Sequence, residues 1–508
     1  MIRKTKYILF LILIASLLFS FSSSKVFAQD DMDLFEEMGD KKESEKKSDD
    51  EDLFNEMDDK EKSDSDEDLF DSMDSNEKKE KKSLNLLKKL WDNLEGSFRV
   101  RYNYFPKHAK DREGLDDNLH VGEALFEFST WTGSDKIQLH TTCWIEAGTQ
   151  EDSYQGGARW FQDNEYYRRY FECNELYFLF LLSDFDVTLG KKLFNNGIST
   201  LYSPSDRFRP SDVHDPLDQK QFGIWQTKVD YYIGDDTLTL AAFPVNTEKK
   251  VPAPGSRWWG ETDEEGSGSS PYDTAENRSP DIEFKYIDCF VKYKTTISGW
   301  DLFVSMNTGP NPYEVLKEEG STTVRKKIRI ATIAGGFSTT SGSLEIHGES
   351  LFNYSEGGKD DDYISSVFGI TYTIEDWAKY LLMEKIILTI EYGWEEITHK
   401  QSADNYTESS SSGRAGQNDL FSKLHLKYNE DLTFDYYANF EFDSKSWMNH
   451  FEAKYKIIDG LTLSVAYQVF AYYDSGDGDD GESSNFNSIS YKEWDNNDRI
   501  ITYLKYKF

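Results

Sequence analysis

The chain has 508 residues, of which only 38% are hydrophobic but 15% are aromatic, and its net charge is −36. The 31 Tyr and 34 Phe exclude a chain that is disordered throughout, and the acidity disfavours nucleic-acid binding, which needs a basic surface. The acidity is spread along the chain, because residues 1–28 carry +4 and residues 29–82 carry −14, which leaves −26 for residues 83–508.

Residues 1–28 have the three parts of a secretory signal peptide. A basic start precedes an apolar run from Tyr7 to about Phe21, and Val26-Phe27-Ala28 offers a small-residue cleavage site. The alternative is an uncleaved anchor, but the run is short for a spanning helix, which needs about 20 apolar residues. No Cys follows the cleavage site, so no lipid anchor is expected there. The sequence therefore predicts export.

Residues 29–82 consist almost entirely of Asp, Glu, Lys and Ser. Such a segment cannot bury enough apolar surface to offset its ordering entropy, so we expect a disordered acidic tail in the periplasm. A DLFxxM-like motif occurs in it three times. Its apolar residues are Leu34, Phe35 and Met38, then Leu53, Phe54 and Met57, then Leu69, Phe70 and Met73. Each copy either docks a periplasmic protein partner by folding on binding or belongs to a duplicated spacer.

Residues 83–94 predict a short amphipathic helix. Leu84, Leu87, Leu90, Trp91 and Leu94 fall on one helical stripe, and the preceding Ser83 suits an N-cap. This helix would rest at the membrane–water boundary or fold into the mouth of the domain that follows.

From Glu95 onward the apolar residues recur with a period of two, which is typical of strands with one apolar and one polar face. We expect an all-β fold, a transmembrane antiparallel β-barrel of about 18 strands over residues 95–508. The expected strands are approximately 96–105, 121–132, 136–147, 170–181, 185–192, 221–233, 236–245, 281–296, 300–308, 327–339, 343–354, 363–374, 385–398, 419–429, 432–443, 446–457, 461–473 and 498–508.

The lengths of the connections separate a membrane barrel from a soluble sandwich or propeller. Short connections alternate with long ones, as in bacterial barrels with tight periplasmic turns and long external loops. Two connections depart from this alternation, since 375–384 is long where a short one is expected and Ser444-Lys445 is short where a long one is expected. The pattern predicts a barrel in the outer membrane of a Gram-negative bacterium, in contact with lipid and with both termini in the periplasm.

The last strand places Ile500, Thr502, Leu504, Tyr506 and Phe508 on one face. A final strand that ends in Phe resembles the signal by which outer-membrane barrels engage the barrel assembly machinery, so we expect that machinery to bind through Phe508.

A second resemblance concerns function. The segment Val187–Leu193 is followed by Asn196-Gly197 and then by the Pro- and Asp-rich run 203–212, and with the strand count it resembles outer-membrane porins of the alginate-export-like porin superfamily. Lys192 stands where that family usually has Gln. The resemblance implies a channel for passive passage of small hydrophilic solutes or saccharides. The alternative is a barrel sleeve or scaffold for a partner complex that the acidic tail recruits.

The loop Leu193–Lys220 is the best candidate for a pore constriction, because three Pro residues limit its flexibility and it carries charges of both signs. It either folds inward and narrows the pore or packs over the rim. Strand phase gives further lumen-facing charges. The pore-lining or constriction candidates are Arg99, Arg101, Lys192, Arg207, Arg209, Asp212, Lys228, Glu391, Lys423 and Lys427; further lumen candidates are Lys454, Lys505, Lys507, Glu123, Glu127, Glu146, Glu175, Asp435, Glu441 and Glu452.

No pattern in the sequence predicts an enzyme, a cofactor or a metal site. The eight His are scattered without a nucleophile motif. Cys143, Cys173 and Cys289 are too widely spaced for a metal site, allow at most one disulfide, and are interpreted as small apolar residues on strands. The acidic run 474–482 offers oxygen ligands for Ca²⁺ but lacks the spacing of a helical calcium loop, so a solvated surface loop is the simpler interpretation.

Overall fold

The computed structural model describes residues 89–508 apart from 109–117, 151–152, 162, 164–166, 207–209, 246, 248, 251, 253–255, 259–275, 279–286, 320–321, 403–405, 408 and 474–490. The N-terminal repeats, Arg207, Arg209 and the acidic run 474–482 therefore lie outside the described residues. No helix among the described residues is long and apolar enough to span a membrane.

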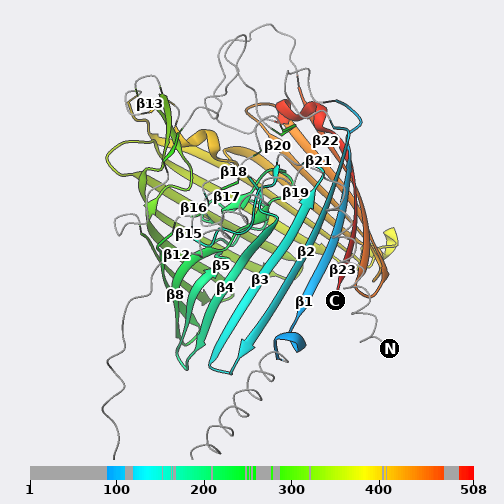
Figure 1. Ribbon diagram of the computed structural model, residues 1–508, viewed down its shortest axis with the longest axis horizontal. Helices are drawn as coiled ribbons and strands as arrows, with labels where there is room; N and C mark the ends of the chain where they lie inside the picture. The colour runs from blue at the N-terminus through cyan, green and yellow to red at the C-terminus, as the bar shows by residue number, and fades with distance from the viewer. Residues whose placement is uncertain are drawn as a thin grey trace, which may run out of the picture. The chain divides into compact units, whose positions relative to one another are not determined.

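Eighteen antiparallel strands form one closed barrel (Figure 1). Each strand pairs with the next along the barrel, and β23 returns to pair with β1 from Ser97↔Lys507 to Tyr104↔Ile500. The barrel strands are β1 (Glu95–Tyr104), β2 (His120–Gly133), β3 (Ile137–Gly148), β4 (Phe171–Leu181), β5 (Phe185–Lys192), β8 (Ile224–Ile233), β9 (Asp236–Phe243), β11 (Asp288–Ile297), β12 (Trp300–Pro310), β15 (Arg329–Ser341), β16 (Leu344–Ser355), β17 (Asp362–Ile374), β18 (Lys385–His399), β19 (Asn418–Lys427), β20 (Leu432–Glu441), β21 (Ser446–Ile458), β22 (Leu461–Tyr472) and β23 (Arg499–Lys507).

Five short strands are described in the connections. β6 (Ser211–Asp212) pairs with β7 (Lys220–Gln221), and β10 (Glu276–Arg278), β14 (Thr322–Lys326) and β13 (Val315–Glu319) form a separate three-stranded sheet. The expected all-β barrel and its strand number are confirmed.

Most expected strand boundaries agree with the structure, but the strand expected at 221–233 begins only at Ile224. The amide of Phe222 donates to the carbonyl of Pro210 (2.7 Å), and the amide of Gly223 donates to the Asn174 side chain (2.8 Å). The amides of Phe222 and Gly223 are thus used outside the strand ladder, and the pairing with β5 begins at Ile224. The strand expected at 281–296 is observed as β11, which starts at Asp288, and residues 281–286 lie outside the described residues.

The strands expose apolar side chains and bury polar ones, the reverse of a soluble sheet. On β22, Val465 and Tyr467 are 46% and 47% exposed, whereas Ser464 and Gln468 are 7% and 3% exposed. Exposed and buried positions also alternate over part of β16, β17 and β18. A lipid bilayer requires an apolar outer surface and backbone groups that all pair within the protein. A closed barrel with an apolar outer belt and a polar interior meets both requirements.

Short turns lie at one end of the barrel, which we call the turn end, and the longer connections lie at the other, the loop end (Figure 1). Several turns have a glycine with positive φ, such as Gly299 (φ 82°) and Gly460 (φ 83°), which other residues rarely adopt. The long connection 375–384 lies at the turn end and contains a 3₁₀ helix, η3 (Ala378–Leu381). At the loop end the unusually short turn after β20 places Lys445 at φ 51°.

Of the amphipathic segment expected at 83–94, residues 89–92 are described and helical. This helical end contacts the turn end of β2, since the hydroxyl of Thr130 donates to the carbonyl of Leu90 (2.7 Å) and the Asn93 side chain donates to the carbonyl of Trp131 (3.0 Å). The chain therefore enters β1 from a point fixed against the neighbouring strand.

The C-terminal Phe508 closes the barrel seam. Its backbone exchanges two hydrogen bonds with Gly96 (3.0 and 3.1 Å), and its ring stacks on Phe126 (6.1 Å between centroids) and Tyr506 (6.3 Å). A Cβ at Gly96 would lie 2.9 Å from the Cε2 atom of Phe508, so a glycine is needed to leave room for the ring.

Replacing Phe508 by Ala should lower the temperature at which the folded barrel unfolds. The two ring contacts are lost while the backbone bonds remain, which should cost about 1–3 kcal/mol. The heat-dependent gel mobility of the purified chain in detergent measures this, with Leu382→Ala at the exposed turn segment as the control. Equal unfolding temperatures for Phe508→Ala and the control would contradict the assigned role at the seam.

Candidate functional site

Residues 193–223 connect β5 to β8, and we call this connection the inner loop. Its described residues, 193–206 and 210–223, lie inside the barrel. It bonds to Glu349 on β16 and Glu391 on β18, and also to Arg99 and Arg101 on β1. These strands lie on different parts of the barrel wall, and both glutamates lie near the middle of their strands. The inner loop therefore crosses the interior at mid-height instead of covering the rim (Figure 1).

The carboxylate of Glu391 holds the first part of the inner loop. It accepts hydrogen bonds from the backbone amides of Thr200 (2.8 Å), Leu201 (3.1 Å to each oxygen) and Tyr202 (2.8 Å). Glu391 is fully buried. Three consecutive amides that point at one carboxylate form a compact anion site, and their bonds to a charged acceptor are stronger than neutral ones.

A histidine on the next strand but one supports this carboxylate. His347 on β16, Gly369 on β17 and Glu391 on β18 lie side by side across three strands. The Nε2 atom of His347 lies 2.9 Å from Oε1 of Glu391, and the His347 side chain is fully buried. The pair passes over Gly369, whose missing side chain leaves the necessary space.

A second glutamate binds the loop on either side of the Glu391 contact. Glu349 accepts hydrogen bonds from the amide of Ile198 (3.0 Å) and the hydroxyl of Ser205 (2.9 Å). Nearby, the Asn196 side chain donates to the hydroxyl of Ser305 on β12 (3.1 Å). The loop is thus attached to this wall at several points within about ten residues.

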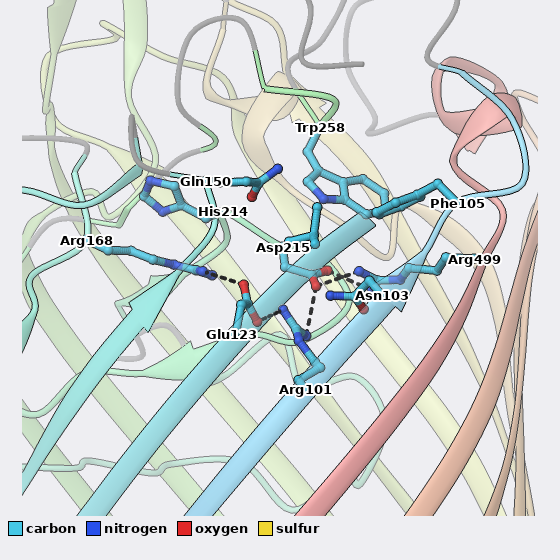
Figure 2. Close-up of a pocket in the computed structure, with 11 residues that line it drawn as sticks. Arg101, Asn103, Phe105, Glu123, Gln150, Arg168, His214, Asp215, Trp258 and Arg499 are labelled. Carbon is cyan, nitrogen blue, oxygen red and sulfur yellow. Dashed lines mark hydrogen bonds and ion pairs between the residues drawn. The ribbon is translucent and has the colours of Figure 1, made fainter. Parts of the chain in front are cut away.

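The far part of the inner loop meets the opposite wall through ion pairs (Figure 2). Asp215 pairs with Arg101 (3.0 Å) and Arg499 (2.7 Å). Asp218 pairs with Arg101 (2.7 Å) and Arg99 (3.1 Å). Arg101 also pairs with Glu123 on β2. The arginines of β1 and β23 therefore face loop carboxylates instead of an open lumen.

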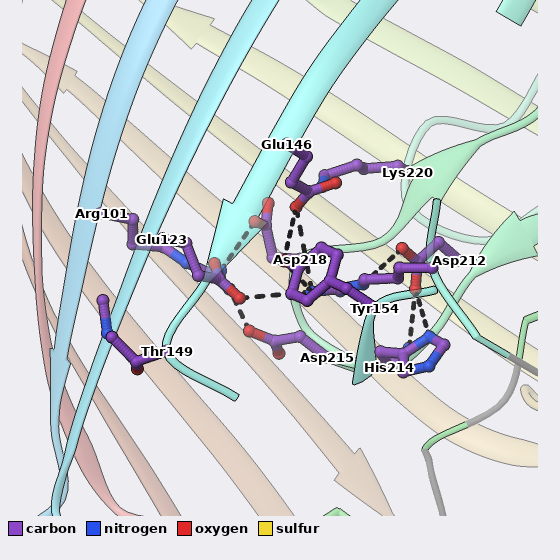
Figure 3. A network of polar contacts seen from close by, with 12 residues as sticks. Arg101, Glu123, Glu146, Thr149, Tyr154, Asp212, His214, Asp215, Asp218 and Lys220 are labelled. Carbon is purple, nitrogen blue, oxygen red and sulfur yellow. Dashed lines mark hydrogen bonds and ion pairs between the residues drawn. The ribbon is translucent and has the colours of Figure 1, made fainter. Parts of the chain in front are cut away.

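Further ion pairs extend this network toward β3 (Figure 3). Arg168 pairs with Asp212 (2.6 Å) and Glu123 (3.2 Å), and Lys220 pairs with Glu146. Five cationic and five acidic side chains take part, and six of the ten are buried while Arg99, Glu123, Asp218 and Lys220 are partly buried. Burial of these charges is tolerated because each charge has a partner. The network consists of Arg99, Arg101, Arg168, Lys220 and Arg499 with Glu123, Glu146, Asp212, Asp215 and Asp218.

These contacts shift the pKa values of the loop carboxylates. Burial alone would raise the pKa of Asp215, but Arg499 and Arg101 outweigh it and lower the pKa to about 2. Burial likewise opposes ionisation of Asp212, yet Arg168 and His214 hold its pKa well below the ordinary value. The loop carboxylates therefore stay charged at neutral pH, which keeps the ion pairs in place.

A small polar pocket remains between the network and an aromatic roof (Figure 2). Arg101, Glu123 and Arg499 line its floor, and the ring of Trp258 lies above with the Arg499 guanidinium 4.9 Å from the ring centroid. Trp258 belongs to a buried apolar cluster with Phe105, Val121, Phe470 and Trp494. Of this cluster, Phe105, Val121 and Trp258 line the pocket and close it toward the loop end.

The structure brings some predicted constriction residues together and separates others. Arg99, Arg101 and Asp212 join the ion-pair network, and Glu391 anchors the inner loop. Lys192 lies at the end of β5 with its amine 4.4 Å from the centroid of Tyr177. The remaining three lie apart from the loop contacts: Lys228 pairs with Asp230, Lys423 lies over Tyr437, and Lys427 pairs with Glu384 and Glu430 at the turn end.

Sequence reasoning did not select His347, Glu349 or Arg168. His347 and Glu349 share the strand face of Asn353, and that alternation could have marked them as lumen-facing. Arg168 lies in a connection, where no periodic signal exists. The role of these residues comes from their contacts with the inner loop or with Glu391, which binds it. Those contacts depend on the path of the loop through the barrel.

No known family profile matches this sequence, and no curated protein matches it. Among solved structures, the chain is similar to OccK11 (OpdR) of Pseudomonas aeruginosa, with 10% identity, a TM-score of 0.42 and coverage of 83% of this chain and 97% of that one. It is also similar to OpdK of Pseudomonas aeruginosa with vanillate, at 10% identity, TM-score 0.42 and coverage of 82% and 99%. OmpTdeltaL8, from an outer membrane protein of Vibrio cholerae, gives 9% identity, TM-score 0.35 and coverage of 82% and 98%. The closed barrel described above rests on this chain's own strand pairings, and the site on its own contacts.

Replacing Gly369 by Ala should release the first part of the inner loop. The added Cβ would collide with His347 and lie 2.6 Å from Cγ of Glu391, so the carboxylate must move away from the loop amides. The amides of Thr200, Leu201 and Tyr202 should then exchange hydrogen roughly tenfold faster or more, which corresponds to about 1.4 kcal/mol of lost protection. Hydrogen exchange measured by mass spectrometry gives this rate.

Gly335→Ala is the matched control for that change, because its added Cβ would come no closer than 3.4 Å to the carbonyl oxygen of Phe303. If both variants leave exchange at 200–202 unchanged, the Glu391 contacts do not hold the loop.

The far part of the inner loop should detach in acid. Because the pKa of Asp215 is about 2 when folded and about 3.9 when unfolded, its ion pairs stabilise the fold above pH 4, and this stabilisation is lost as the pH falls toward 2. The contribution is about 2 kcal/mol. Unfolding temperatures from pH 6 to pH 2 should therefore fall more steeply for the natural chain than for Asp215→Asn. Parallel curves would show that Asp215 does not contribute.

Proposed function

We propose that this chain is an outer-membrane channel for passive passage of small hydrophilic solutes, with the inner loop as its constriction. The observation that supports this best is the loop's course through the barrel at mid-height, held by Glu391 and Glu349 on one wall and by Arg99, Arg101 and Arg499 on the other. A pore that is narrowed by charged side chains selects solutes by size and polarity.

The charges at the constriction favour a channel that does not select solutes of one charge. Carboxylates and cationic groups occur together there and neutralise one another in pairs. A dedicated path for acidic polysaccharide would need a surplus of unpaired cationic groups. We therefore favour small hydrophilic solutes of either charge over acidic polymers, and we propose no chemical reaction on them.

The proposed location follows from the architecture. Both ends of the barrel sequence, Glu95 and Lys507, lie at the turn end, as in bacterial barrels whose short turns face the periplasm. In this orientation residues 29–82 would be periplasmic and free to engage a partner. The barrel assembly machinery would bind the last strand through Phe508 before the seam closes.

Planar-bilayer recording of the purified full-length chain tests the channel proposal. We expect discrete conductance steps, and a reversal potential close to zero in a KCl gradient because the charges at the constriction are paired. Glu391→Gln combined with Glu349→Gln should increase the conductance and its fluctuation, since the amides of the inner loop lose their charged acceptors.

Glu384→Gln serves as the control, because Glu384 lies at the turn end against Lys427, away from the inner loop. Folded barrels that insert without conducting would reject the channel. Conducting barrels whose currents are the same in the double variant and the control would reject the inner loop as the constriction.

A further inference from the structure

Two of the three cysteines lie directly opposite each other on neighbouring strands. Cys143 on β3 is the register partner of Cys173 on β4, and their Sγ atoms lie 3.0 Å apart. Both side chains are buried, and the hydroxyl of Thr141 lies 3.7 and 3.8 Å from the two sulfur atoms. The third cysteine, Cys289, lies on β11 and is exposed.

This pair coincides with an irregularity in the barrel wall. The register of β3 and β4 shifts between Thr142 and Cys143, because Thr142 pairs with Glu175 and Cys143 pairs with Cys173. Asn174 is the extra residue of this β-bulge. A bulge interrupts the ladder of backbone hydrogen bonds and so weakens the local hold between two strands.

Both ends of the inner loop are attached at this bulge. The Asn174 side chain donates to the carbonyl of Gln221 (3.1 Å) and accepts from the amide of Gly223 (2.8 Å). The carboxylate of Glu175 accepts from the amide of Leu193 (3.2 Å). The residues that follow Cys173 therefore fix the first and last residues of the loop that crosses the barrel.

We propose that Cys143 and Cys173 form a disulfide in the mature chain, and that this bond fixes the bulge to which the inner loop is attached. Directly opposed residues of antiparallel strands have Cα atoms about 4.5–5.5 Å apart, which lies within the range of disulfides. With the sulfur atoms already in contact, small side-chain rotations bring them to bonding distance. An exported chain passes through a compartment where disulfides form and persist.

The reaction needs a protein disulfide as the oxidant. The thiolate of one cysteine attacks this disulfide, forms a mixed disulfide and releases one thiolate of the oxidant. The thiolate of the second cysteine then attacks the sulfur of the first, which forms the Cys143–Cys173 bond and releases the second thiolate. The chain loses two electrons and two protons, and the oxidant gains both as two thiols.

Counting thiols in the full-length chain tests the bond. The chain is isolated from outer membranes, denatured with a polymer-linked maleimide present, and resolved by gel electrophoresis with and without prior reduction. We expect one labelled thiol, Cys289, before reduction and three afterwards. Cys143→Ser and Cys173→Ser should each show two labelled thiols without reduction, and Cys289→Ser should show none.

Chemical oxidation addresses the geometry independently of the cell. The purified, reduced and folded chain is treated with diamide, which accepts two electrons and two protons from a pair of thiols. Loss of two of the three labelled thiols, in the natural chain and not in Cys143→Ser, supports the proposal. Three labelled thiols in the membrane-derived chain and after diamide would overturn it.

The effect on the inner loop is measured by hydrogen exchange at the amides of Leu193 and Gly223. Exchange at both should be faster in the reduced chain than in the oxidised chain, and reduction should have no effect in Cys143→Ser. Equal exchange in the oxidised and reduced chains would overturn the proposed role at the bulge. None of these measurements depends on conductance, so their outcome is independent of the channel proposal.

Discussion

The interior of this barrel depends on the buried carboxylate of Glu391. A loop that enters a closed barrel brings backbone amides to a place where the wall offers none of its own backbone acceptors, because those are already paired between strands. Side chains must therefore supply the acceptors. Glu391 serves three consecutive amides at once and is itself supported by His347. Without such an acceptor several buried amides would lack a hydrogen-bond partner, which would raise the free energy of this path. A path over the rim would then be favoured.

At the opposite wall the loop is held by ion pairs instead of hydrogen bonds from backbone amides. There the loop presents carboxylates, and Arg99, Arg101 and Arg499 of the wall receive them. Arginine suits this task because its planar group donates several hydrogen bonds in fixed directions, and Arg499 engages both oxygens of Asp215. Buried ion pairs are costly to break once they have formed, so they define one position of the loop.

The fold was predictable from the sequence to a greater extent than the site. Strand phase and connection length give the barrel, its 18 strands and most of their boundaries, because each depends on local alternation. Phase also identifies Glu391, Arg99 and Arg101 as polar positions on their strands. It does not indicate that Glu391 binds amides some 190 residues away, nor that Gly369 must lack a side chain beside His347. These roles depend on the path of the inner loop, which strand phase does not predict.

The attachments of the inner loop differ in what can release them. The ion pairs of Asp215 depend on charge and fail in acid, whereas the hydrogen bonds of Asn174 to Gln221 and Gly223, at the last end of the loop, involve neutral groups and are insensitive to pH. The positions of the loop ends depend on the bulge that carries Asn174. At a bulge the ladder of backbone hydrogen bonds is interrupted, so the two strands are held less firmly there. A covalent bond between Cys143 and Cys173 would strengthen that point without adding a titratable group. In acid the far part of the loop would then detach while the loop ends stay fixed to the wall.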